Sequence, residues 1–149
     1  MWFDEISMPA LLRHARNTYG AAMRKALAKA GYDDIPGNGL YIIGGLALAP
    51  QQIALTDLIE EMHISQSAAS LLVETLVNRG YLVVVKDDGT KLEVTLTERG
   101  RAAAATQAAA REKIDAALLA AVGAADISRT RRTLAVLFDI GHPGDHAQK

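Results

Sequence analysis

The sequence predicts a mainly α-helical fold that carries a small two-stranded β-wing. Apolar residues recur at helical spacing over 8–31 and again over 66–78. Residues 98–122 are rich in alanine, the residue with the highest helix propensity. Two β-branched runs flank Asp88–Gly89, which is a strong hairpin signal. With 149 residues, the chain is long enough for one domain with a core or for two small lobes.

The first third of the chain is predicted to hold two helices. Pro9 suits the first turn of a helix over 8–31, and Gly31 suits its end. Proline, glycine and aspartate indicate a loop over 32–39. Residues 40–49 are short and almost wholly apolar, so their length allows a helix or a strand. Alanine and leucine dominate the second half of this segment, which favours a buried helix.

The middle of the chain is predicted to form a short strand, a helix, a turn and a second helix. Residues 53–55 suit the strand, and Thr56 caps a helix over 56–62. After a tight turn, Ser65 caps a helix over 66–78. One apolar stripe at helical spacing predicts that a single face of this helix is buried: Ala69, Leu72, Val73 and Leu76.

A hairpin and two further helices complete the prediction. The β-branched runs 81–85 and 91–97 form the hairpin strands, and Thr97 caps the alanine-rich helix. The last helix starts at Asp126 or Ser128. Its apolar residues predict a buried side: Leu134, Val136, Leu137, Phe138 and Ile140.

Residues 56–97 are predicted to form a helix, a turn, a helix, a strand, a turn and a strand, in that order. This order predicts a winged helix-turn-helix lobe. The second helix of such a lobe enters the DNA major groove, and the hairpin tip reaches the backbone or the minor groove. Lys86 and Lys91 flank the hairpin turn and suit phosphate contacts. The alternative reading is a solvated helix start and solvated charges. The outward face of the second helix carries candidates for contact with base edges, phosphates or a thymine methyl: Gln66, Ser67, Ser70 and Leu71.

Residues 55–102, "LTDLIEEMHISQSAASLLVETLVNRGYLVVVKDDGTKLEVTLTERGRA", resemble the MarR (multiple antibiotic resistance regulator) family. The run S-x-S-x-x-S-x-L-V-x-x-L-x-x-R-G and the closing "LTERGRA" carry the resemblance. The long first helix, the alanine-rich helix and the final helix extend it over most of the chain.

The resemblance implies a homodimeric transcriptional regulator, usually a repressor, that binds a pseudo-palindromic double-stranded DNA site. Residues 1–35 would form an N-terminal dimerisation helix, and 101–149 would form the C-terminal dimerisation helices and a tail. Residues 36–100 would form the DNA-binding lobe, with the recognition helix at about 66–79 and the wing at about 81–97. Many family members respond to a small aromatic or phenolic ligand bound between the dimer helices and the lobe.

The winged lobe departs from the family pattern in its charge. The family often places arginine at Leu71, and its wing commonly contains D-x-R where this chain reads "KDDGTKLE". Residues 53–100 hold eight acidic and four basic side chains, a net charge of −4. Phosphate neutralisation supplies most nonspecific DNA affinity, so this charge opposes binding. The alternative function is therefore a winged-helix ligand-sensing or protein-interaction module that has lost DNA binding.

A ligand cleft is predicted near the dimer helices, where Tyr19, Met23 and Tyr41 would line it together with Trp2 and Phe3. An apolar cleft with few polar groups suits a flat hydrophobic molecule. The alternative is that these side chains serve ordinary core and dimer packing.

Several classes of function find no support in the sequence. The chain has no cysteine, which excludes disulfides and thiolate metal sites, and its four histidines lack ligand spacing. No phosphate loop, cofactor fingerprint or catalytic set is present, so we predict neither a cofactor nor an enzyme. No apolar run approaches the roughly 20 residues that span a bilayer, and the acidic N-terminus lacks a secretory signal. A cytoplasmic protein is expected.

Overall fold

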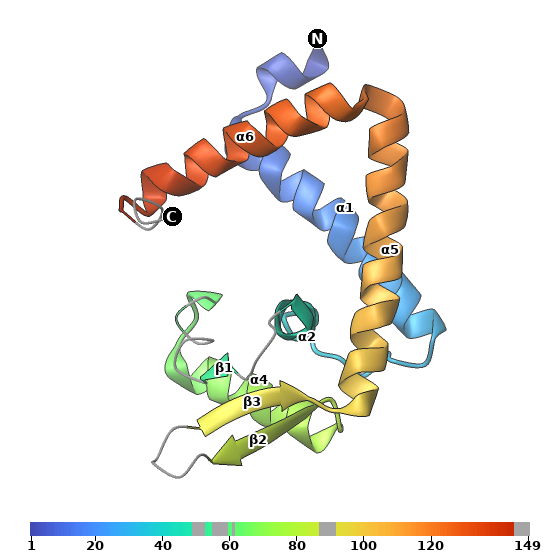
Figure 1. The fold of residues 1–149 in the computed structure, drawn as a ribbon, viewed down its shortest axis with the longest axis vertical. Helices are drawn as coiled ribbons and strands as arrows, with labels where there is room; N and C mark the ends of the chain where they lie inside the picture. The colour runs from blue at the N-terminus through green and yellow to red at the C-terminus, as the bar shows by residue number, and fades with distance from the viewer. Residues whose placement is uncertain (49–52, 55–59, 61, 87–91, 145–149) are drawn as a thin grey trace. The chain divides into compact units, whose positions relative to one another are not determined.

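The computed structural model describes residues 1–48, 53–54, 60, 62–86 and 92–144. By its internal contacts the chain divides into two compact units, Met1–Arg111 and Glu112–Lys149. Within the described residues, the first unit contains the following helices and strands (Figure 1): a 3-10 helix (Trp2–Glu5), α1 (Met8–Lys29), α2 (Gly39–Leu48), β1 (Ile53–Ala54), α4 (Gln66–Asn78), β2 (Leu82–Lys86), β3 (Leu92–Leu96) and the start of α5 (Glu98–Val122). Helix α5 continues into the second unit, which also holds α6 (Ala124–Gly141).

The helices of the first unit confirm the predictions from periodicity and capping. Helix α1 has a proline in its first turn, and Gly31 follows it with φ +89°, a left-handed conformation that glycine adopts without steric cost. The apolar segment after the loop is a helix, α2, rather than a strand. The predicted helix over 56–62 lies largely outside the described residues.

The three strands form one antiparallel sheet in the order β1-β3-β2. Val94 of β3 pairs with Val84 on one side and with Ile53 on the other, and its side chain is fully buried. Leu82 pairs with Leu96, and both of these side chains are buried as well. The predicted hairpin is therefore confirmed, and its central strand supplies the sheet's contribution to the core.

The core of the first unit gathers around α2, which packs against α4 and β3. Helix α2 presents apolar side chains at nearly every position, so it is buried on several faces rather than along one stripe. The largest fully buried side chains come from α2, α4 and the two strands of the hairpin: Tyr81, Leu40, Ile42, Ile43, Leu76, Leu82 and Val94.

Helix α6 corrects two predictions. It begins at Ala124, before Asp126 and Ser128, because Gly123 has φ +82° and separates it from α5. The expected buried side is exposed in the single chain, and α6 contains no buried residue. Helical spacing identifies which side chains share a face, but it does not show whether one chain alone covers that face. The exposed fractions are 40–73% for Leu134, Val136, Leu137, Phe138 and Ile140.

No helix in the described part of the chain combines the length and the apolar character that a membrane span requires.

Candidate nucleic-acid interface

Helix α4 projects one polar face from the first unit while its opposite face is buried. Ser65 caps it as predicted, since its hydroxyl oxygen accepts a hydrogen bond of 3.1 Å from the amide of Ala68. The buried face consists of Ala69, Val73 and Leu76. All four predicted contact residues are exposed together on the outer side: Gln66, Ser67, Ser70 and Leu71.

The outer face of α4 has little charge and one large apolar side chain. Glu74 is the helix's one charged residue, and it is exposed. Leu71 is 65% exposed among the small polar groups. The chemistry available at this face is therefore hydrogen bonding by amide and hydroxyl groups together with one methyl-rich contact, rather than charge attraction.

The wing presents Lys86 and an apolar strand. Lys86 is exposed at the end of β2, whereas Lys91 lies outside the described residues. Val83, Val84 and Val85 precede Lys86 and are 45%, 38% and 38% exposed. The exposed surface of β2 is therefore largely apolar. Contact with phosphate alone does not require such a surface.

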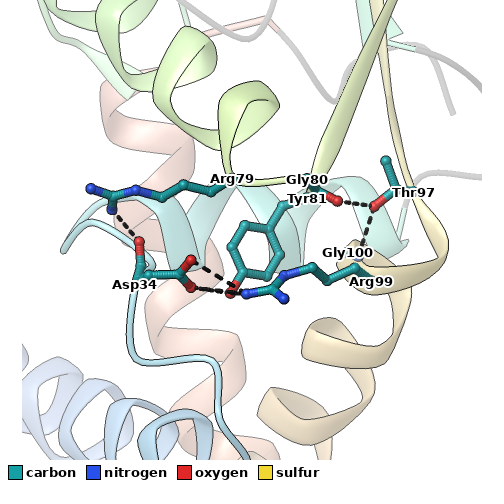
Figure 2. A network of polar contacts seen from close by, with 7 residues as sticks. All are labelled: Asp34, Arg79, Gly80, Tyr81, Thr97, Arg99 and Gly100. Atoms are coloured by element: carbon teal, nitrogen blue, oxygen red, sulfur yellow. Dashed lines mark hydrogen bonds and ion pairs between the residues drawn. The ribbon is translucent and has the colours of Figure 1, made fainter.

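Arg79, directly after α4, is directed at the loop between α1 and α2. One of its Nη atoms donates a hydrogen bond to the backbone oxygen of Asp34 (Figure 2). The sequence suggests two other roles for an arginine here, a DNA contact or compensation of the helix C-terminus. The loop contact is a third role, and it binds two segments of the first unit together.

Asp34 is the centre of a polar network, with Tyr81 and Arg99 on its carboxylate (Figure 2). The hydroxyl of Tyr81 donates to the carboxylate, and Arg99 Nη2 lies 3.2 Å from Oδ1 and 2.9 Å from the Tyr81 hydroxyl. The Arg99 guanidinium also lies 4.6 Å from the centre of the Tyr81 ring. Arg99 therefore forms a salt bridge with Asp34.

This network shifts the pKa values of its members in opposite directions. The hydrogen bond from Tyr81, with Arg99 adding its charge, lowers the pKa of Asp34 below its ordinary value. Burial raises the pKa of Tyr81, and its hydrogen bond to Asp34 raises it further. Both shifts favour one state, an ionised Asp34 that accepts a hydrogen bond from a neutral Tyr81.

A second set of bonds joins the start of β2 to the start of α5. Thr97 Oγ1 donates to the carbonyl of Gly80 at 2.5 Å and accepts from the amide of Gly100 at 3.0 Å, which confirms Thr97 as the cap of α5 (Figure 2). The amide of Thr97 donates to the Tyr81 carbonyl at 3.0 Å. The end of α4, the first residues of the wing and the first turn of α5 are therefore one connected structure.

Asp34 and Tyr81 were not identified from the sequence. Asp33 and Asp34 are adjacent in a loop of turn-forming residues, and no local pattern separates the exposed Asp33 from the bonded Asp34. Tyr81 follows a helix-ending glycine and reads as the first residue of a strand. A tyrosine at a position that the fold buries needs a partner for its hydroxyl, which is the one signal that was available.

The three predicted ligand residues do not line one pocket. Met23 lines a cavity of about 360 Å³, and Tyr41 lines a separate cleft of about 470 Å³. Tyr19 lines neither. The cleft at Tyr41 is basic, and Arg16 stacks over the Tyr41 ring at 4.4 Å. It is lined by Leu12, Arg13, Arg16, Asn17, Arg24, Gly37, Asn38 and Tyr41.

The cavity at Met23 contains a buried amide that was also missed. Gln107 is only 4% exposed, and its Nε2 donates to the Leu40 carbonyl at 2.8 Å. Its Oε1 has no hydrogen-bond partner among the described residues. Half of the lining residues are alanines and leucines of α2, β3 and α5, and Arg101 and Arg111 also line the cavity. Within the described residues, no group of three or more histidine, aspartate or glutamate side chains is placed to hold a metal ion.

Comparisons with known proteins connect this geometry to DNA-binding folds. A family model described as the IclR helix-turn-helix domain matches residues 37–86, which include α2, α4 and β2. No curated protein sequence matches the chain significantly. FabT of Streptococcus pneumoniae, solved in complex with DNA, is 14% identical with a TM-score of 0.76, and the match covers 91% of this chain and 95% of FabT.

Two further solved structures are similar over almost their whole length. The MepR–DNA complex of Staphylococcus aureus is 14% identical with a TM-score of 0.74, covering 91% of this chain and 98% of MepR. Rv2887, a MarR family protein of Mycobacterium tuberculosis solved with salicylic acid, is 23% identical with a TM-score of 0.61, covering 90% of this chain and 98% of Rv2887.

Proposed function

We propose that this chain is a homodimeric transcriptional regulator that binds duplex DNA. It has the winged helix-turn-helix fold of MarR-family proteins. Its site would be pseudo-palindromic, because a two-fold dimer presents the same helix twice. The observation that carries the proposal is α4, a 13-residue helix with one face in the core and a polar face exposed. FabT and MepR, which share the fold, were both solved with DNA.

The proposed contacts follow from the chemistry of each side chain. Gln66, Ser67 and Ser70 would hydrogen-bond base edges or phosphates, and Leu71 would contact a thymine methyl. Lys86 and Lys91 would neutralise phosphates beside the wing. With few positive charges, the lobe would depend on shape and hydrogen bonds more than on charge, so its affinity would be modest and its salt dependence shallow for a DNA-binding protein.

The exposed apolar side chains support dimerisation. Five apolar side chains between residues 134 and 140 of α6 are 40–73% exposed, and Trp2, Phe3 and Met8 at the start of the chain are 70%, 39% and 55% exposed. Monomeric proteins rarely expose large contiguous apolar patches. In a two-fold dimer the two recognition helices would lie about 34 Å apart, one turn of DNA.

The cavity at Met23, which Gln107 also lines, supports modulation by a small ligand. The protein would act as a repressor, and ligand binding would release it from DNA. The volume of the cavity suits a one-ring or two-ring molecule, and its wall is mostly apolar. Gln107 lines this cavity, and its buried Oε1 has no hydrogen-bond partner among the described residues. Because an unpaired buried oxygen is costly, a ligand that reaches this atom and donates a hydrogen bond to it would be preferred. Such a ligand is phenolic or otherwise bears an O–H or N–H group. It shifts the dimer between states only as far as its affinities for them differ.

A second candidate function is a winged-helix module that senses a ligand or binds a protein without binding DNA. The exposed run Val83–Val85 and the exposed Leu71 favour it, because apolar surface of this kind suits a protein partner more than a polyanion.

Selection from random duplex DNA separates the two candidates. Purified protein is incubated with a random duplex library at low and at moderate salt, and retained sequences are read. A regulator enriches a palindromic motif at both salt concentrations. A chain that enriches no motif even in dilute buffer is the non-DNA-binding module. Light scattering at micromolar concentration tests the dimer separately.

A further inference from the structure

One residue of the loop between α1 and α2 is bonded to two segments of the winged lobe, the connection between α4 and β2 and the first turn of α5. Arg79, after α4, donates to the backbone oxygen of Asp34, while Tyr81, before β2, and Arg99, in α5, bind its carboxylate (Figure 2). We infer that Asp34 is a positioning residue: it holds α4 at a fixed angle to α1 and thereby sets the distance between the two recognition helices of a dimer. The consequence for DNA rests on the proposed function.

Packing alone attaches α1 to the lobe at few points. Of its 22 residues only Gly20 and Leu27 are buried, and Leu27 is the one that belongs to the buried core. Met23 is partly buried against the same core. A long helix with so few buried side chains can tilt, so polar contacts decide its direction: the Asp34 network after its C-terminal end, and Arg16, which bonds and stacks on Tyr41 of α2.

The bonds to Asp34 suit this role because they reach both its backbone and its carboxylate, from the connection between α4 and β2 and from α5. Figure 2 shows Arg79 on one side of Asp34, with Tyr81 and Arg99 on the other. The Tyr81 side chain is fully buried, and Arg99 stacks on its ring, so the hydroxyl cannot follow the loop if the loop moves. Backbone and carboxylate of one residue are thus held together against the lobe.

The network restrains direction more than it stabilises the fold. The side chains of Asp34 and Arg99 are 39% and 44% exposed. Water screens an ion pair this open, so its contribution to the free energy of unfolding is small. Loss of the network should therefore leave the lobe folded while its orientation to α1 becomes variable.

A small change of orientation matters at the far end of α4. Its 13 residues span about 20 Å at 1.5 Å per residue. A tilt of about 10° at the Arg79 end moves the Gln66 end by about 3 Å, close to the rise of one base pair. Two lobes that vary by this amount no longer match one fixed half-site spacing.

A distance measurement within one chain tests the inference without DNA. The chain has no cysteine, so Lys25→Cys on α1 and Ser70→Cys on α4 place two spin labels at exposed positions without background. Labelled protein is diluted with unlabelled protein, so that a dimer rarely carries labels on both chains. Double electron–electron resonance spectroscopy then measures the distance between the two labels of one chain.

We expect a narrow distance distribution in the labelled wild type and one at least twice as broad in Asp34→Ala. Asp34→Glu, which keeps a carboxylate, should restore much of the narrow distribution. Asp33→Ala is the matched control in the same loop and should leave it unchanged. Circular dichroism confirms that each variant is folded. Equal widths in folded wild type and folded Asp34→Ala would overturn the inference.

Binding to duplexes with altered spacing tests the consequence for DNA. The selected site is remade with its half-sites one or two base pairs closer or further apart. Wild type should prefer one spacing by at least tenfold, whereas Asp34→Ala should lose affinity for that spacing and prefer it by less than threefold. If wild type selects no site, the proposed function fails, while the label distances still decide the role of Asp34. If Asp34→Ala showed the same dependence of affinity on half-site spacing as wild type, that result would also contradict the proposed role of Asp34.

Discussion

The backbone oxygen of Tyr81 occupies the space in which a side chain at Gly100 would begin. A Cβ atom built on Gly100 would lie 2.2 Å from this oxygen and 3.0 Å from a methyl carbon of Leu96. The contact brings the first turn of α5 against the start of the wing, where the Tyr81 carbonyl also accepts from the amide of Thr97. The obstacle is backbone, so it cannot rotate away as a side chain would.

Gly100→Ala should therefore destabilise the fold. Overpacking against backbone typically costs about 1–3 kcal/mol, and the direct overlap places this variant near the upper end of that range. Gly45→Ala is the matched control, because Gly45 is also helical and has no atom within 4 Å of its Cβ position. It should be stabilising by about 0.5–1 kcal/mol through helix propensity. Urea unfolding measures the free energy of unfolding of both variants. If Gly100→Ala left this free energy unchanged, the result would contradict the close approach of the Tyr81 carbonyl to Gly100.

Asp34 should make stability depend on pH in the acid range only. Its lowered pKa means that the folded protein binds this proton less tightly than the unfolded chain, whose pKa is near 3.8. The contribution of the carboxylate is therefore complete above the unfolded pKa and is lost as pH falls through the lower, folded value. Because the side chain is more than a third exposed, we expect Asp34→Ala to cost less than about 1 kcal/mol at neutral pH.

Unfolding free energies of wild type and Asp34→Ala at neutral pH and well below pH 3.8 measure this effect. The difference between the two proteins should shrink in acid, after allowance for the side-chain contacts that alanine also removes. Asp33→Ala provides the control for a loop carboxylate outside the network. If the difference in unfolding free energy between wild type and Asp34→Ala stayed constant across this pH range, the charge of Asp34 would not contribute to stability.

The sequence predicts the local elements of this fold well because their causes are local. Spacing of apolar residues determines α1 and the buried face of α4, and the hydroxyls of Ser65 and Thr97 cap the helices directly after them. The start of α6 was misplaced because the conformation of Gly123, which separates two helices, has no distinctive local pattern.

The functional contacts were harder to predict because they join distant parts of the chain. Asp34 is 45 residues from Arg79 and 65 from Arg99, and Gln107 is 67 residues from its partner Leu40. No local pattern distinguishes these side chains from solvated ones. The exposed side of α6 was mispredicted for a related reason, since burial there depends on what lies outside the segment.

The wing lysines should govern the salt dependence of DNA binding. Each phosphate contact contributes about 0.9 to the slope of log affinity against log salt, so Lys86→Ala in both subunits should reduce the slope by nearly 2. The selected duplex is titrated by fluorescence anisotropy at several salt concentrations. Lys113→Ala, at an exposed position of α5 outside the winged lobe, is the control. An unchanged slope for Lys86→Ala would show that the wing does not contact phosphate.

Gln107 should make the cavity select ligands that donate a hydrogen bond. Its Nε2 is held by the Leu40 carbonyl, so the amide is oriented, and Oε1 is the atom that has no partner among the described residues. We choose 4-hydroxybenzoate and 4-methylbenzoate as a matched pair of probes, since a methyl group replaces the hydroxyl and the para hydroxyl cannot bond the carboxylate of its own molecule. A buried unpaired acceptor costs about 1–3 kcal/mol, so wild type should prefer 4-hydroxybenzoate by roughly fivefold to a hundredfold. Calorimetry measures both affinities.

The variant Gln107→Leu should bind the two probes with affinities within about threefold, because leucine offers no acceptor to the hydroxyl group. The variant also loses the bond to Leu40, so its folding is checked first by thermal unfolding. Thr106→Ala is the control on the same helix, since the Thr106 hydroxyl bonds the Ala102 carbonyl and does not line the cavity. If folded Gln107→Leu kept the full preference for 4-hydroxybenzoate, the hydroxyl would be recognised by another group, and Arg101 and Arg111 in the cavity wall would be tested next.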